Sequence, residues 1–178
     1  MIFRKTDIAG AYVIDPEPRT DERGSFSRIF CAREFAREGI IPFAPAQENR
    51  SFTRYKGTIR GLHYQLPPAA EDKLIQCISG AIYDVVLDLR RESPTFKKWV
   101  GFELNEENQK MMFVPKGCAH GFQSLCDGSV VHYLVSEFYA PDKEHGIRWS
   151  DPSFGIDWPI MNNVIVSEKD RNWPLQYE

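Results

Sequence analysis

Strict alternation of side chains in the middle of the chain is the feature that most constrains its fold. Over residues 81–90, one face carries Ala81, Tyr83, Val85, Leu87 and Leu89, and the other carries Ile82, Asp84, Val86, Asp88 and Arg90. Successive side chains of a β-strand point to opposite faces of a sheet, so this period of two predicts a strand. Residues 130–138 alternate similarly, which predicts a second strand with Val131, Tyr133 and Val135 on one face.

Further short strands and turns continue this pattern. Residues 98–104 and 110–114 are predicted as strands, and Pro, Gly and Asp clusters mark the turns between neighbouring segments. Several short strands at this spacing indicate an all-β sandwich, jelly roll or barrel, and not β-α-β units. The one good helix candidate in the first half covers residues 31–38 and is closed by Gly39. It is short and charged, so we expect it on the surface.

Length and charge narrow the classes of protein. The 178 residues are uninterrupted by a linker, repeat or low-complexity tract, which predicts a single domain over residues 1–178. The formal net charge is −3, from 22 basic and 25 acidic residues. This balance argues against a protein that grips nucleic acid or an anionic membrane, but it leaves room for a basic pocket around a small anion.

The sequence also bears on the compartment. No run free of Asp, Glu, Lys and Arg exceeds ten residues, whereas a membrane-spanning helix needs ~20 apolar residues. The first residues lack the apolar run of a signal peptide, so we expect a cytoplasmic protein. The cysteines fall in no Cys-x-x-Cys pair and are interpreted as buried thiols without assigned chemistry. They are Cys31, Cys77, Cys118 and Cys126.

The densest group of chemically active side chains lies in residues 57–65, Gly-Thr-Ile-Arg-Gly-Leu-His-Tyr-Gln. In a regular strand Arg60 and His63 lie on opposite sides, whereas a bulge at Gly61 changes that parity. A lone strand histidine is usually a half-buried, hydrogen-bonded residue, but the neighbours of His63 weaken that interpretation. A second histidine, His120, follows a Pro-Lys-Gly turn at residues 115–117.

These two segments are similar to the two signatures of the cupin jelly roll. A metal-binding cupin takes His-x-His and a glutamate from the first signature and another histidine from the second, whereas this chain has His63-x-Gln65. Glutamine is a poor replacement for imidazole at a transition-metal site. His63 and His120, with Glu71 as the remaining candidate, make a weak set of ligands, so we expect no catalytic metal. A Gly-x-Gly-x-x-Gly fingerprint and a Walker loop are both absent from the sequence.

The same residues suit proton transfer. A histidine is the natural general base near neutral pH, which fits His63. Lys73 or Arg60 can stabilise the enolate oxygen that forms when a carbon acid loses its α-proton. Tyr133 can return a proton from another side. Base, oxyanion stabiliser and separate acid are the parts of an epimerase that acts beside a ketone, and the residues alone support this as one possibility among several.

Taken together and in order, the motifs resemble the dTDP-4-dehydrorhamnose 3,5-epimerase family over residues 21–174. They are Asp21-Glu-Arg-Gly-Ser-Phe26, Gln47-Glu-Asn49, Ile59-Arg-Gly-Leu-His-Tyr-Gln65, Lys73, Asp84-Val-Val-Leu-Asp-Leu-Arg90, Ser93-Pro-Thr-Phe96, Pro115-Lys-Gly-Cys-Ala-His-Gly-Phe122, Tyr133, Tyr139-Ala-Pro141, Glu144, Gly146-Ile-Arg-Trp149, Asp151-Pro152, Gly155-Ile-Asp-Trp-Pro159 and Ser167-Glu-Lys-Asp170. Each motif is common, but the ordered set is highly specific.

The resemblance implies a cupin-type jelly roll with a few short surface helices and no metal or organic cofactor. It implies a homodimer whose N-terminal strands are exchanged between the copies. The implied reaction is 3,5-epimerisation of a nucleotide-diphospho-4-keto-6-deoxy sugar, most simply a dTDP-linked one, on the route to L-rhamnose or a related sugar.

Roles for individual residues follow from the same resemblance. His63 takes the protons from C3 and C5 beside the C4 ketone, and Asp170 holds its tautomer. Tyr133 is the general acid on the opposite face, and Lys73 stabilises the enolate oxygen. Contact with the sugar, phosphates or base is implied for Arg23, Phe26, Arg28, Gln47, Asn49, Arg60, His120, Tyr139, Glu144 and Lys169.

Plainer explanations exist for several of these residues. Without the resemblance, Asp170 is explained by a salt bridge near the C-terminus, Lys73 by a solvated strand end and Tyr133 by core packing. Asp84 and Asp88, with Arg90, are interpreted as structural groups that satisfy one another.

One position departs from the family pattern. Arg28 stands where the rhamnose enzymes usually carry a glutamate that contacts the nucleotide, and a guanidinium only donates hydrogen bonds. A single-carbon epimerase or one that uses another nucleotide sugar is therefore an alternative. A metal-dependent cupin oxygenase is disfavoured by the missing His-x-His, and a non-catalytic binding module by the intact base, acid and cation.

Overall fold

The computed structural model describes residues 1–40 and 43–176. The strands are β1 (Ile2–Lys5), β2 (Tyr12–Asp15), β3 (Arg19–Asp21), β4 (Gly24–Phe26), β5 (Gln47–Thr53), β6 (Thr58–Gln65), β7 (Lys73–Ser79), β8 (Ala81–Asp88), β9 (Trp99–Asn105), β10 (Met111–Val114), β11 (Cys118–Ser124), β12 (Ser129–Val135), β13 (Glu144–Gly146) and β14 (Ile165–Val166). The helices are α1 (Ala32–Arg37) and α2 (Glu168–Arg171). The predicted strands at 81–90, 98–104, 110–114 and 130–138 are thus confirmed to within a few residues.

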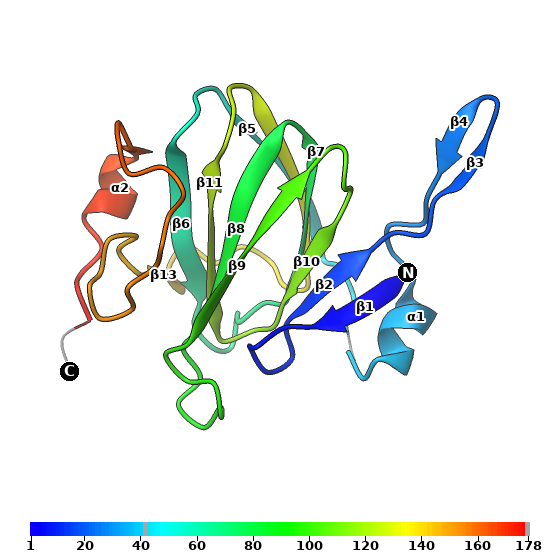
Figure 1. The fold of residues 1–178 in the computed structure, drawn as a ribbon. Helices are drawn as coiled ribbons and strands as arrows, with labels where there is room; N and C mark the ends of the chain where they lie inside the picture. Colours follow the sequence, from blue (N-terminus) through cyan, green and yellow to red (C-terminus); the bar gives the residue numbers. More distant parts are fainter. Residues whose placement is uncertain (41–42, 177–178) are drawn as a thin grey trace.

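The strands form two main sheets that face each other (Figure 1). The first sheet has the order β1-β2-β10-β7-β12-β5, and the second has the order β13-β6-β11-β8-β9 with β14 added beside β6. Neighbouring strands are antiparallel except for β14, which runs parallel to β6. The expectation of an all-β, two-sheet fold is therefore confirmed. A separate hairpin, β3–β4, pairs only with itself and extends away from both sheets (Figure 1).

Alternating side chains on β8 join two layers of the core. Ile82 and Val86 point between the sheets, where they pack with residues of the first sheet such as Ile75. Val85 and Leu87 point outward and are covered by the C-terminal segment, which supplies Ile147, Phe154 and Trp158 to the cluster. Both faces of this strand are buried because the C-terminal segment covers the outer one.

A third cluster lies where α1 covers the outer face of the first sheet. Phe35 of α1 is 1% exposed and packs against Phe43 and Phe113. The predicted helix is confirmed, with Cys31 as its N-cap and Gly39 in a left-handed conformation after its end. The helix lies on the surface as expected, and it docks there through the one buried ring of Phe35. Neither α1 nor any other helix in the described residues is long and apolar enough to cross a membrane.

The cysteines only partly match expectation. Cys77 and Cys118 are buried, whereas Cys31 and Cys126 are partly exposed, so the interpretation as buried thiols is wrong for the latter two. All four thiols are free. Burial raises the pKa of Cys77 to about 11 and that of Cys118 to about 12, which keeps both thiols protonated.

Two glycines allow β6 and β11 to approach closely. A Cβ atom on Gly61 would lie 2.7 Å from both the Gly121 Cα and the His120 carbonyl oxygen, and Gly61 has φ of +115°. The pairing register of the two strands shifts between His120 and Phe122. The regular parity of β6 is therefore broken between Arg60 and His63, which is the irregularity that Gly61 makes possible.

Asp88 anchors the loop that follows β8. Its buried carboxylate accepts hydrogen bonds from Arg90 at 2.8 Å and from the Ser93 and Thr95 hydroxyls at 2.6 Å each. Burial disfavours ionisation, but these donors outweigh it and hold the pKa of Asp88 far below its usual value. The structural interpretation suits Asp88 and Arg90. It is wrong for Asp84 as a member of this group, because the Asp84 carboxylate binds a histidine instead.

Replacing this carboxylate tests the anchoring role. Asp88→Asn is expected to lower the free energy of unfolding by about 3 kcal/mol at pH 7, because Arg90 loses its charged partner in a part-buried site. Denaturant titration followed by circular dichroism measures the change. Asp142→Asn, which removes a surface carboxylate paired with Lys143, is the control. An effect of Asp88→Asn no larger than that of the control would contradict the role.

Candidate functional site

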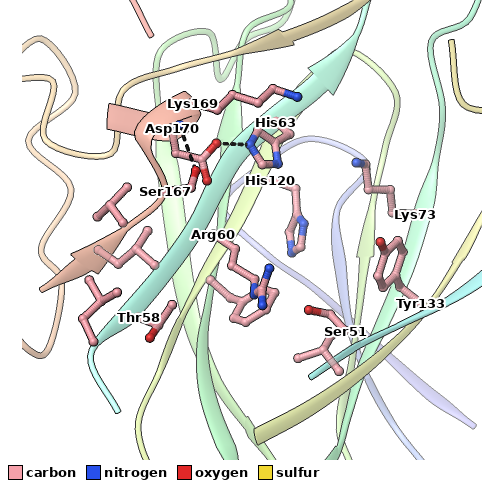
Figure 2. A pocket seen from close by; sticks show the side chains of 15 residues that line it. Ser51, Thr58, Arg60, His63, Lys73, His120, Tyr133, Ser167, Lys169 and Asp170 are labelled. Carbon is pink, nitrogen blue, oxygen red and sulfur yellow. Dashed lines mark hydrogen bonds and ion pairs between the residues drawn. The ribbon is translucent and has the colours of Figure 1, made fainter. Parts of the chain in front are cut away.

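A cavity of about 540 Å³ lies between the two sheets and is lined by charged side chains from both. Arg60, His63 and His120 come from β6 and β11 of the second sheet, and Lys73 and Tyr133 come from β7 and β12 of the first. Figure 2 shows His63 on one side of the cavity, with Lys73 and Tyr133 across from it. The break in β6 parity thus places both Arg60 and His63 on the same cavity.

A carboxylate from the last helix orients His63. The Asp170 Oδ1 atom lies 2.5 Å from His63 Nε2, and Asp170 Oδ2 accepts a bond from the Gly61 backbone N–H. The Ser167 hydroxyl caps α2 by accepting from the Asp170 backbone N–H. The sequence prediction that Asp170 pairs with His63 agrees with this geometry, although 107 residues separate the two.

The pairing also decides which ring nitrogen is free. Burial disfavours ionisation of Asp170, but its hydrogen bonds, the one from His63 first, hold its pKa below the usual value. An ionised carboxylate only accepts hydrogen bonds, so Nε2 of a neutral His63 must carry the proton. The unprotonated Nδ1 then faces the cavity (Figure 2).

Tyr133 and Lys73 face this histidine from the other sheet. Burial, followed by the charge of Glu71, raises the pKa of Tyr133, so its phenol stays protonated at neutral pH. The Lys73 Nζ atom lies 2.8 Å from a Glu71 carboxylate oxygen, and both side chains are largely buried. Glu71, considered above as a metal ligand, instead holds the ammonium group at the cavity wall.

Arg60 and His120 line the cavity next to His63. The Arg60 guanidinium donates to the Thr53 hydroxyl at 3.0 Å and to the Phe52 carbonyl oxygen at 2.9 Å, which fixes its plane. His120 Nε2 lies 2.7 Å from an oxygen of the fully buried Asp84 carboxylate. Sequence reasoning missed this contribution of Asp84. Its position on the inward face of the alternating 81–90 strand was the available signal.

Four more residues that were predicted to contact substrate lie together beside the first cavity. Gln47, Asn49, Tyr139 and Glu144 line an adjoining cavity of about 360 Å³ that shares His63, Lys73 and Tyr133 with the first. Glu144 accepts a 2.5 Å bond from the Tyr139 hydroxyl and pairs with Lys169 at 2.6 Å. Burial raises the pKa of Glu144, but the bonds from Lys169 and Tyr139 outweigh it, so the net shift is downward. Lys169 lines the inner cavity as well.

Three predicted contacts do not reach either of these cavities within one chain. Arg23 lies on the projecting hairpin and pairs with Asp21, and Phe26 at its end is 72% exposed. Arg28 follows the hairpin and pairs with Glu34 of α1 at 2.9 Å. Within one chain these residues lie away from the site, because the hairpin folds on itself and leads away from the sheets (Figure 1). Their contacts with substrate stay predictions for the homodimer with exchanged N-terminal strands.

Trp173 was not singled out by the sequence. Its ring packs directly on Gly146, lies with its centroid 6.5 Å from that of His63, and has the Lys169 ammonium 5.9 Å from its centre. The segment after residue 147 has no period that would have indicated this contact.

The cavity chemistry is that of proton transfer. In residues 1–40 and 43–176, no group of three or more His, Cys, Asp and Glu side chains is placed to hold a metal ion. The two cavity histidines are instead each bound to a carboxylate. A free imidazole nitrogen, a protonated phenol facing it from the other sheet and an ammonium group form a site that can deprotonate a carbon acid and reprotonate it from the other side.

Comparison with known proteins agrees with this chemistry. A family model described as dTDP-4-dehydrorhamnose 3,5-epimerase matches residues 5–178. A curated enzyme of that name from Methanothermobacter thermautotrophicus is 44% identical, covering 98% of this chain and 94% of its own.

Solved structures of related proteins are also similar to this chain. The dTDP-4-dehydrorhamnose 3,5-epimerase of Bacillus anthracis, with TDP and PPi bound, superposes with a TM-score of 0.94 at 40% identity, covering 98% of this chain and 99% of its own. ChmJ, a 3'-monoepimerase from Streptomyces bikiniensis in complex with dTDP-quinovose, has a TM-score of 0.89 at 34% identity, covering 96% and 85%.

The His63–Asp170 pair predicts a pH-dependent stability. Asp170→Asn is expected to lower the free energy of unfolding by about 1–3 kcal/mol at pH 7, because a buried charge-assisted hydrogen bond is lost. The folded pKa of Asp170 lies below the unfolded value of ~3.9, so its stabilisation is complete above that value and is lost as the pH falls through the folded pKa.

Denaturant titrations of the two proteins at pH 7, 5 and 3.5 measure this difference. The gap between wild type and Asp170→Asn should be full at the upper two values and smaller at the lowest. Asp142→Asn serves as the exposed control. A gap at pH 3.5 that is as large as or larger than the gap at pH 5 would show that Asp170 is not ionised against His63 in the folded protein.

Proposed function

The chain belongs to the dTDP-4-dehydrorhamnose 3,5-epimerase family, and from this membership we propose that the cavity between its sheets carries the family's reaction through His63, Tyr133 and Lys73. The predicted recognition and cupin-type fold are confirmed by these matches. The protein is an isomerase, an epimerase of dTDP-L-rhamnose biosynthesis. The observation that carries the residue assignment is the placement of a base and an acid on opposite sheets of one cavity.

In the first step, the hydrogen on a carbon beside the C4 ketone is removed. His63 Nδ1 takes the proton, and the electron pair of the C–H bond moves onto the ketone oxygen to form an enolate. The Lys73 ammonium group stabilises that oxygen, and Asp170 stabilises the imidazolium that forms. The short Asp170–His63 contact supports this division of roles.

In the second step, the enolate carbon is protonated from the other face. Tyr133 donates its phenolic proton, the ketone re-forms, and the configuration of the carbon is inverted. The imidazolium then loses its proton to solvent while the phenolate regains one. The raised pKa of Tyr133 supports this role, since the phenol is protonated when the step begins. The same sequence applies at C3 and at C5, because both carbons flank the ketone.

The remaining residues of the site suit the nucleotide and the diphosphate. Arg60 and His120 extend the cavity with donors for the sugar or its phosphates, and Lys169 adds a cation at the cavity edge. Tyr139 is well placed beside the second cavity to contact the base or the ring. TDP is the nucleotide in the Bacillus anthracis structure, and it is the nucleotide proposed here.

A homodimer would bring the projecting hairpin into use. In the described residues, β5 lies at the edge of the first sheet, with strand β12 on one side only, and it carries Gln47 and Asn49 of the site. Edge strands expose unpaired backbone groups that readily accept another strand. The β3–β4 hairpin of a second copy, laid near this edge, would deliver Arg23 and Phe26 to the open mouth of the site.

In such a dimer, the charge of Arg28 is already paired with a carboxylate of its own chain. Its guanidinium donates to Glu34 within its own chain, and that contact raises the pKa of Arg28. The N-terminal ammonium of Met1 also donates to Glu34, and this bond first, with that from Arg28 second, lowers the pKa of Glu34. The Met1 ammonium pairs with Glu17 as well, so these two cations and two carboxylates balance and present less positive charge to a nucleotide than a free arginine would. We therefore expect that the protein still prefers a dTDP sugar, although Arg28 stands where the family usually has a glutamate.

Similarity to ChmJ keeps a single-carbon reaction as the second candidate, because that relative is a 3'-monoepimerase. Its 34% identity is lower than the 40% and 44% of the 3,5-epimerases compared above, which favours inversion at both carbons. For the compartment, we propose the cytoplasm, where four free cysteines remain reduced.

Solvent exchange tests the reaction. Incubation of the protein with dTDP-4-dehydro-6-deoxy-D-glucose in D₂O is expected to place deuterium at C3 and C5, as seen by NMR. His63→Ala should lower exchange at both carbons by ~10²–10⁴-fold because the general base is lost. Tyr133→Phe should retain exchange, since His63 can remove and return a proton on one face, while formation of the inverted product falls.

The outcomes of this experiment separate the candidates. Deuterium at C3 alone indicates the single-carbon reaction. No exchange by a folded wild-type protein with any 4-keto nucleotide sugar would reject the function, and full product formation by Tyr133→Phe would reject its role as the acid. Asp88→Asn, assayed at a temperature where it is folded, is the control for effects of stability alone.

Subunit mixing tests the dimer. His63→Ala and the double variant Arg23→Ala/Phe26→Ala are each expected to have little activity. Co-expressed in equal amounts, they form mixed dimers in which one site has both an intact His63 and an intact partner hairpin. With random pairing about half of the dimers are mixed and each has one intact site of two, so the mixture should recover about a quarter of the wild-type activity per subunit. Recovery no greater than the sum of the two variants measured separately would exclude exchanged hairpins.

A further inference from the structure

Gln65 is almost fully buried at the end of β6, two residues after His63, yet the reaction proposed above gives it no part. Its side-chain amide donates to the Ala69 carbonyl oxygen at 2.9 Å and to the Phe138 carbonyl oxygen at 3.2 Å. Its carbonyl oxygen Oε1 accepts from the Ala140 backbone N–H at 2.7 Å. The amide therefore bridges the end of β6 to two segments that lie outside the strands.

The bridged segment, residues 138–140, carries Tyr139. It follows β12 without joining a sheet, and Tyr139 is 56% exposed, so burial does not fix its position. Side-chain groups instead hold its backbone at three consecutive residues: Gln65 binds Phe138 and Ala140, and Gln47 Oε1 accepts from the Tyr139 N–H at 2.7 Å. With its backbone held there, the Tyr139 hydroxyl reaches Glu144.

We propose that Gln65 is a positioning residue for the nucleotide end of the site, acting through Tyr139. The inference rests on the proposed function, in which Tyr139 contacts the base or ring of the nucleotide. The same amide side chain that makes a His-x-His metal site unavailable thereby sets the loop that recognises the substrate. Substrate affinity then depends on Gln65, whereas the proton transfers at His63 and Tyr133 do not.

The chemistry of the three contacts requires an amide. Two carbonyl oxygens need donors and one backbone N–H needs an acceptor, and a glutamine side chain offers two donors together with an acceptor. A glutamate would keep the bond from Ala140 but would place a carboxylate against the carbonyl oxygens of Ala69 and Phe138. A methionine has similar length and makes none of the three bonds.

The chain offers a matched control in Gln123 on β11. This glutamine is also buried, and it clamps a single backbone position in the same way: Nε2 donates to the Ile160 carbonyl oxygen at 2.7 Å, and Oε1 accepts from the Ile160 N–H at 2.9 Å. Gln65 also lines the second cavity, whereas Gln123 lines neither cavity of the site. Replacing Gln123 therefore measures how the loss of a buried amide side chain affects the protein in general, because the loop that carries Tyr139 is left unchanged.

Steady-state kinetics of Gln65→Met and Gln123→Met test the proposal, with dTDP-4-dehydro-6-deoxy-D-glucose as substrate and TDP binding by calorimetry. Gln65→Met is expected to raise KM and the Kd of TDP ~10-fold with kcat changed less than about twofold. Gln123→Met should leave all three constants near the wild-type values. An equal change in the two variants, or a loss of kcat without a change in KM, would overturn the role.

A second pair of variants asks whether Gln65 acts through Tyr139. In a Tyr139→Ala background, Gln65→Met should cause no further increase in KM, because the side chain that the clamp positions is gone. A further increase of the same size as in the wild-type background would contradict the inference. If Gln65→Met does not fold, Gln65→Glu replaces it with the same expectations. Absence of turnover by the wild-type protein would instead reject the proposed function itself.

Discussion

The hydrogen bond between Asp170 and His63 joins the two parts of the molecule on which the site depends. It ties the C-terminal helix to strand β6, and the same carboxylate also holds the Gly61 backbone, where the strand departs from regular pairing. The irregular strand turns Arg60 and His63 toward one cavity, and the carboxylate directs the free nitrogen of the histidine into it. Tyr133 and Lys73 on the facing sheet line the same cavity, across from this histidine.

Most charges at the site are held by a charge of the opposite sign on the protein. Lys73 is held by Glu71, and Glu144 is held by Lys169. A buried charge is tolerated when it is paired and hydrogen-bonded, and a paired side chain keeps its position before a ligand arrives. The site is thus organised in advance for charge that develops on the substrate, which is the condition under which electrostatic stabilisation lowers a barrier.

The sequence specified the sheets better than it specified the site. Alternation over 81–90 and 130–138 predicted strands and their faces because a side-chain period of two leaves little choice. The contact between Asp170 and His63 followed only from the family resemblance, since pairing over 107 residues leaves no local signal. The path of the hairpin with Arg23 could not be predicted either, because a self-paired hairpin can point in any direction that its flanking chain allows.

The tautomer of His63 tests the central claim most directly. Nitrogen-15 NMR of the free protein near pH 8, with the His63 signals assigned through a variant at that position, reports which ring nitrogen carries the proton. For the neutral form of the ring, the account predicts the hydrogen on Nε2, facing Asp170, and a bare Nδ1 facing the cavity. A hydrogen on Nδ1 with a bare Nε2 would contradict it, because the nitrogen assigned as the base would then have no lone pair to accept a proton.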